Sequence, residues 1–95
     1  PWASVRFDAF TYHYALDYDQ TYRSQIMLRQ QIAFCQERLK QNLDAIKTYE
    51  ITLSLCSMHP HDLTPTLKVV QKMANLKLHN LRDKENQRSR ANNKN

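Results

Sequence analysis

The feature that most constrains this chain is a periodic run of apolar side chains between Leu28 and Cys56. Its members recur every three or four residues, as they do on one face of an α-helix. We call this set the seam: Leu28, Ile32, Cys35, Leu39, Asn42, Ile46, Tyr49, Leu53 and Cys56. Neither glycine nor proline interrupts the run, so the pattern predicts one long helix over residues 20–58.

Asn42 is the polar exception in the seam. In a coiled coil, a single buried asparagine fixes the register and the number of partners. At the edge of a bundle, the same side chain would meet water. The sequence leaves both alternatives open, and the first of them implies a homodimer held through the seam.

The complete lack of glycine narrows the fold class further. Glycine serves tight turns and close approach of the backbone to phosphate groups. Its absence excludes the glycine-rich nucleotide-binding loops and argues against a turn-rich β fold. Since 95 residues support a single domain, we expect an all-α fold, a small helical bundle built on a long antiparallel helical hairpin.

A second helix is predicted after the break at Pro60. Thr64 followed by Pro65 has the pattern of an N-cap and a first helical residue. A helix over 64–84 then places one apolar face toward the first helix: Leu67, Val70, Met73 or Ala74, Leu78 and Leu81. The folded domain is expected to span 1–84. Residues 85–95 are expected to form a disordered basic tail, because Ala91 is their one apolar residue.

The first 19 residues form an aromatic segment that fits either a strand or a helix. We favour a short helix, because an isolated strand would have nothing to pair with. Its rings either cover the end of the helical core or form a surface that grips a peptide. Asp17 or Asp19 is the expected N-cap of the long helix.

Charge and cysteine usage limit the kind of partner and the compartment. Residues 62–95 carry a net charge of +5, the net charge of the whole chain. This surface favours acidic peptides, nucleic acid or an anionic membrane. Cys35 and Cys56 both lie on the seam, which predicts buried, reduced thiols and an intracellular protein. No apolar run is long enough to span a membrane.

Metal binding and catalysis find little support in the residue pattern. Cys56, His59, His61 and Asp62 could supply zinc-type ligands, but the usual paired ligand set is missing. We therefore expect a polar turn with an inward cysteine and no bound metal. Cys56 and His59 have no third group to orient them. We expect no enzymatic activity and no cofactor.

The stretch from Leu43 to Lys77 resembles a known family. The stretch begins with apolar residues at Leu43, Ile46, Tyr49 and Ile51. These are followed by Asp62-Leu63, then by Thr66-Leu67-Lys68 and a basic helix. The pattern is similar to the integrase-binding domain of lens epithelium-derived growth factor, within the transcription-elongation-factor N-terminal (TFIIS-type) domains. The resemblance implies a right-handed helical bundle of a nuclear protein. It also implies an interhelical pocket, rimmed by basic residues, for short acidic and aromatic motifs.

On this resemblance, Lys68 and Lys72 fall on the family's basic helix, and Met73 or Leu76 falls near its pocket aromatic. The leading hypothesis is a nuclear, non-enzymatic module that binds a partner helix or an acidic, aromatic motif, or a second copy of itself. Its expected binding residues are Lys68, Lys72, Met73, Leu76, Lys77 and Leu78, with the seam as a further partner surface. The alternative is a nucleic-acid-binding protein that uses the basic second helix and tail and dimerises through the long helix. A third hypothesis is a coiled coil that only oligomerises.

Overall fold

The described part of the chain folds into four helices. The computed structural model describes residues 2–18 and 21–93. In chain order the helices are α1 (Trp2–Tyr18), α2 (Tyr22–Arg38), α3 (Asn42–Met58) and α4 (Pro65–Asn93). The described ranges contain no strand, so the all-α prediction is confirmed. The helix favoured for the aromatic segment is present as α1.

The single long helix predicted over 20–58 is wrong, because the chain turns between α2 and α3. Lys40 adopts a left-handed backbone conformation with φ of 64°. Its N–H donates to the carbonyl of Glu37 (3.1 Å), and the N–H of Gln41 donates to the carbonyl of Gln36 (2.8 Å). These two bonds form a Schellman motif, which satisfies the last carbonyls of a helix and ends it. Glycine usually occupies the left-handed position, so a lysine there gives no warning in the sequence.

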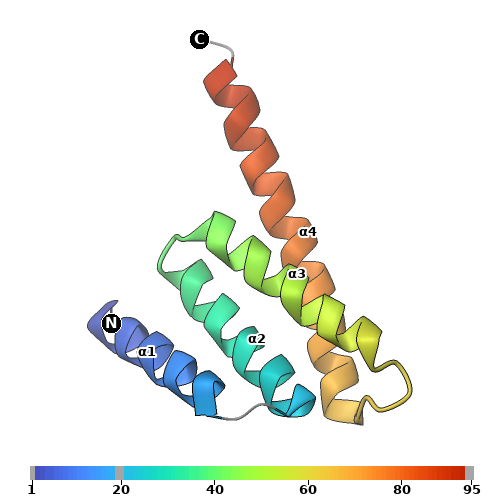
Figure 1. Cartoon of the computed structure of the whole chain (residues 1–95). Coiled ribbons are helices and arrows are strands. Elements are labelled where there is room, and N and C mark those ends of the chain that lie inside the picture. Colours follow the sequence, from blue (N-terminus) through green and yellow to red (C-terminus); the bar gives the residue numbers. More distant parts are fainter. Residues whose placement is uncertain (1, 19–20, 94–95) are drawn as a thin grey trace.

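Three helices surround the core, and α1 lies against one of them. In the described residues α2 contacts α3 and α4, α3 contacts α4, and α1 contacts α2 alone. Figure 1 shows α1 and α4 on opposite sides of α2. One buried cluster contains Ala33, Ala45, Tyr49, Ala74, Leu78 and Leu81. The other contains Ile26, Cys56, Leu67 and Val70.

The seam is divided between two interfaces inside the chain. Leu28 and Leu39 both lie beside residues of α1, namely Ala15 and Ala3. Burial, followed by the charge of Asp8 on α1, raises the pKa of the Cys35 thiol on α2. The α3 half of the seam packs in the two buried clusters: Ile46, Tyr49, Leu53 and Cys56. All nine seam residues are buried or half-buried, so the chain's own helices cover the surface that we had expected a partner to use.

Asn42 has a partner within the chain. Its Nδ2 donates to Oε1 of Glu85 at 3.2 Å, which joins the start of α3 to α4. Of the two sequence alternatives, this position corresponds to the edge of the bundle, because Asn42 is half-buried and pairs across to another helix.

The basic tail also differs from the expectation. Instead of ending near Lys84, α4 continues to Asn93, and its last turns extend beyond the other helices (Figure 1). No glycine or proline follows Pro65, and the region is rich in good helix formers. The bond between Asn42 and Glu85 also attaches the first of these added turns to the bundle.

Threonine side chains cap the starts of α2 and α4. Thr21 caps α2 by accepting the N–H of Ser24 at 3.4 Å. The expected caps are therefore corrected: Asp17 belongs to α1, and Asp19 lies outside the described residues. At α4 the prediction is confirmed, because Thr64 accepts the N–H of Leu67 at 3.2 Å and the helix begins at Pro65.

Candidate interaction surface

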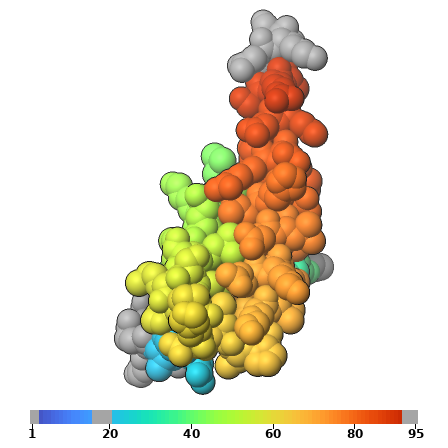
Figure 2. Space-filling model, turned by 90° about the vertical axis from the view of Figure 1, so that its right-hand side faces the viewer, coloured from blue at the N-terminus to red at the C-terminus, as the bar shows by residue number. Residues whose placement is uncertain are grey.

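The outward face of α4 carries three exposed apolar side chains. Val69 is 56% exposed, Met73 is 42% exposed and Leu76 is 61% exposed. Their spacings of four and three residues place them in one line along the helix. We call this set the α4 stripe. The same helix buries Leu67 and Ala74 on its opposite side, and Figure 2 shows α4 uncovered on the side that faces the viewer.

Two lysines border this stripe near the start of α4. Lys68 and Lys72 are exposed and form no ion pair with any described residue. Both line an open cleft of about 440 Å³ between the end of α3, the connecting loop and α4. The rest of the cleft wall comes from Cys56, Ser57, Pro60, Leu63 and Gln71. The cleft therefore combines a mixed apolar and polar lining with two cations that have no ion-pair partner among the described residues.

Two of the six predicted binding residues point into the protein instead. Leu78 is part of the buried core. Lys77 Nζ lies 3.5 Å from Oε1 of Glu37 and 4.8 Å from the ring centre of Phe34. The structure therefore brings Lys68, Lys72, Met73 and Leu76 together on the surface. It uses Lys77 and Leu78 to hold α4 against α2 and α3.

A polar network fixes the position of α4 relative to the other two core helices. The hydroxyl of Tyr49 on α3 donates to Oε2 of Glu37 on α2 at 3.0 Å. The other oxygen of Glu37 pairs with Lys77 of α4. Burial, followed by the nearby charge of Glu37, raises the pKa of Tyr49 well above its ordinary value of 10.0. Tyr49 therefore stays a neutral hydrogen-bond donor throughout the physiological range.

The loop that borders the cleft is held by Tyr22. Its ring stacks on that of His59, with 4.1 Å between the ring centres. Its hydroxyl donates to the backbone carbonyl of Asp62 at 3.0 Å. Cys56 is fully buried, and this burial raises the pKa of its thiol. Across the described residues, no three His, Cys, Asp or Glu side chains gather in a way that could hold a metal ion.

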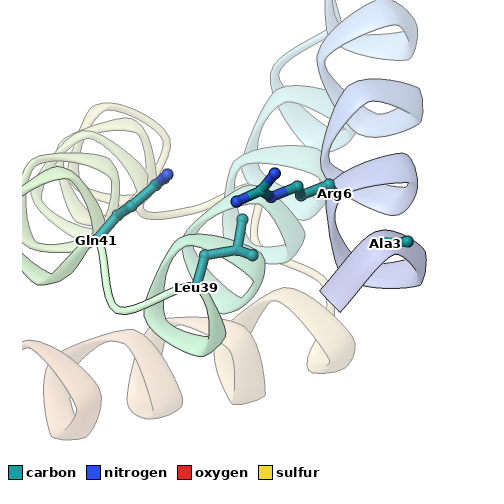
Figure 3. A pocket seen from close by; sticks show the side chains of 4 residues that line it. All are labelled: Ala3, Arg6, Leu39 and Gln41. Carbon is teal, nitrogen blue, oxygen red and sulfur yellow. The ribbon is translucent and has the colours of Figure 1, made fainter. Parts of the chain in front are cut away.

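A larger open cleft lies at the other end of the molecule. It measures about 760 Å³ and lies between the first turns of α1 and the turn after α2. Figure 3 shows Arg6 extending over Leu39, with Ala3 and Gln41 at its sides. Arg6 is the one charged side chain among these four lining residues. Among the described lining residues, no acid or second base accompanies Arg6, so this part of the lining offers a single cation.

A second exposed stripe lies along α1. The sequence left open whether the aromatic rings of this segment cover the core or form a surface. Phe7, Phe10 and Tyr14 are each more than half exposed. Their spacings of three and four residues place them in one line, which we call the α1 stripe. Val5 is buried on the same helix, where α1 meets α2. These three rings thus form a surface and do not cover the core.

No helix within the described ranges has the length and apolar character needed to cross a bilayer. Comparisons with family models, with curated proteins and with solved structures each found no match to this chain. The resemblance to the integrase-binding domain therefore stays an expectation from the sequence.

Proposed function

We propose that this chain is a non-enzymatic protein-interaction module. Its α4 provides the surface that binds an acidic, aromatic segment of a partner. The observation that carries the proposal is the α4 stripe, three exposed apolar side chains beside two lysines that have no ion-pair partner among the described residues. The intracellular, nuclear location expected from the sequence belongs to this proposal. Two free, buried cysteines are compatible with a reducing compartment.

The chemistry of this surface favours a mixed apolar and acidic ligand. Covering a half-exposed aliphatic side chain contributes about 1 kcal/mol, since complete burial is worth roughly 1.5–3 kcal/mol. Methionine adds favourable contacts to aromatic rings. Carboxylates of the ligand would meet Lys68 and Lys72 at the cleft. A ligand that lacked either feature would leave part of the surface unused.

The distribution of basic residues favours a peptide over a nucleic-acid backbone. Arg82 pairs with Glu50 at 3.1 Å, and Lys77 pairs with Glu37. Arg88 lies 4.0 Å from Glu85. These acidic partners interrupt the basic surface along α4, whereas a nucleic-acid backbone offers a regular line of phosphates. We therefore propose a peptide ligand, and the experiment compares its binding with that of duplex DNA.

The test measures binding by fluorescence anisotropy. The probe is a short fluorescein-labelled peptide of Glu and Asp that carries two Phe three residues apart. Substituting both lysines (K68E/K72E) should weaken binding about tenfold or more, because two attractive charge pairs become repulsive. The same peptide with Lys in place of its acidic residues should not bind.

The matched control is K84E/R90E, which changes the net charge equally on the exposed far part of α4. This variant should bind the probe as the natural chain does, and the circular-dichroism spectra of all variants should remain helical. Equal weakening by both variants would show attraction to net charge alone and would overturn the proposal. Tighter binding of duplex DNA than of the peptide, with a steep salt dependence, would favour the nucleic-acid alternative instead.

A further inference from the structure

We infer that the α4 stripe of one copy binds the α1 stripe of a second copy, with the two helices antiparallel. This inference rests on the proposed function, because it identifies the aromatic, acidic segment that the α4 surface takes. The chain would thus contain both halves of the contact. Each half is exposed in a single copy: Phe7, Phe10 and Tyr14 on α1, and Val69, Met73 and Leu76 on α4.

The spacing of the two stripes supports this pairing. Along α1 the residues follow one another by three and then four positions, and along α4 by four and then three. Reversing the direction of one helix makes the two patterns identical. Both stripes extend over eight residues, which are seven steps or about 10 Å of helix at 1.5 Å per residue. An antiparallel alignment therefore places Phe7 opposite Leu76, Phe10 opposite Met73 and Tyr14 opposite Val69.

The chemistry of the two surfaces is complementary as well. Aromatic rings pack favourably against a methionine thioether and against the face of a lysine ammonium. The protein already makes the second contact internally, where Lys77 lies 4.8 Å from the ring centre of Phe34. By sequence, residues 1–22 carry a net charge of −2, and residues 62–95 carry +5. Pairing two α4 stripes would instead bring Lys68 and Lys72 of both copies together.

A single chain cannot satisfy its own stripes in this fold. Within the described residues α1 contacts α2 alone, and α4 lies on the other side of α2 (Figure 1). The contact therefore joins different surfaces of two copies, one contributing α1 and the other α4. Such a heterologous contact makes a prediction about mixtures that a self-paired surface does not share.

The experiment uses two full-length variants, each with one altered stripe. F7Q/F10Q changes α1, and M73Q/L76Q changes α4; all four positions are exposed, so both variants should keep the helical spectrum. By sedimentation velocity, the natural chain should gain average mass with concentration, and each variant alone should remain monomeric. An equimolar mixture should form a complex of two chains and nothing larger, because it contains one intact stripe of each kind.

Each other result overturns the inference in a distinguishable way. If F7Q/F10Q still self-associates, the contact joins two α4 stripes; if M73Q/L76Q does, it joins two α1 stripes. A natural chain that stays monomeric at every concentration rules out a second copy as the partner. In that last case, retained binding of the acidic aromatic peptide would leave the proposed function standing. If the chain neither self-associates nor binds the peptide, the inference and the proposed function are both overturned.

Discussion

Gln30 offers the sharpest test of how this core is held together. Its side chain is 4% exposed, and neither its amide nitrogen nor its amide oxygen has a hydrogen-bond partner among the described residues. It lies on α2 between Ile26 and Ala33, each of which belongs to a different buried cluster. We expect the substitution Gln30→Met to stabilise the protein, since methionine has a similar volume and no polar group to desolvate.

The magnitude follows from the cost of burying an unpaired amide. Mutational data place that cost at about 1–3 kcal/mol. The free energy of unfolding should therefore rise by about 1–3 kcal/mol. For a domain of this size, each kcal/mol raises the melting temperature by roughly 4–8 °C.

Gln36 provides the matched control on the same helix. Its Oε1 accepts a hydrogen bond from the hydroxyl of Thr48 at 2.6 Å, so Gln36→Met should lower the free energy of unfolding by about 1 kcal/mol. Urea unfolding followed by circular dichroism measures both variants. Destabilisation by Q30M, together with the expected loss in Q36M, would mean that the Gln30 amide is hydrogen-bonded in solution. The reasoning about its cost would then be refuted.

Two further predictions concern the turn and the ionisable core. Lys40→Gly should stabilise the protein by about 0.5–1 kcal/mol in thermal unfolding, because glycine adopts the left-handed conformation without strain. Lys47→Gly, within α3, should lower the free energy of unfolding by about 1 kcal/mol. If Lys40→Gly also destabilises the protein, the assignment of the turn is contradicted. At alkaline pH the free energy of unfolding should fall, first through Cys35 and Cys56 above about pH 9 and then through Tyr49 above about pH 10. Burial raises the pKa of each group in the folded state, so the folded chain retains a proton that the unfolded chain loses. For each group in that pH range, the free energy of unfolding falls by about 1.4 kcal/mol per pH unit. Urea titrations between pH 8 and 11 should show a shallower decline above pH 10 for Tyr49→Phe, and a flat profile in the natural chain would contradict the burial of these groups.

Local signals in the sequence predicted local structure well. Thr64 and Pro65 define a helix start through steric and hydrogen-bonding rules that act within a few residues, and α4 begins there. Apolar periodicity identified part of the core, because burial follows the face of a helix, but it did not include the buried Ile26, Ala33 and Ala45. Cys35 and Cys56 are both buried and free for this reason.

Signals that depend on the rest of the fold were not available from the sequence. The seam was interpreted as one surface because no glycine or proline interrupts it, yet backbone hydrogen bonds at Lys40 end the helix. The residue in that left-handed position bears a strain that packing elsewhere must offset. For the candidate site, the sequence placed six binding residues on one helix. It could not separate Lys72, which faces solvent, from Lys77, because the carboxylate of Glu37 that pairs with Lys77 belongs to another helix.

The turn at Lys40 also determines what kind of association this chain can form. A continuous helix over 20–58 would leave the seam open along about 40 Å, enough for a stable coiled-coil dimer. Because α3 folds back on α2 and α1 covers the other half of the seam, the α1 stripe and the α4 stripe remain as short exposed apolar lines with spacings of three and four residues. The other exposed apolar side chains among the described residues are spread out, with Leu43, Ile51 and Met58 lying seven or eight residues apart on α3. A stripe of three side chains and two lysines buries far less than the roughly 1,600 Å² of a standard stable interface. Association through these stripes should therefore be weak and reversible, and it should depend on protein concentration and, through Lys68 and Lys72, on salt.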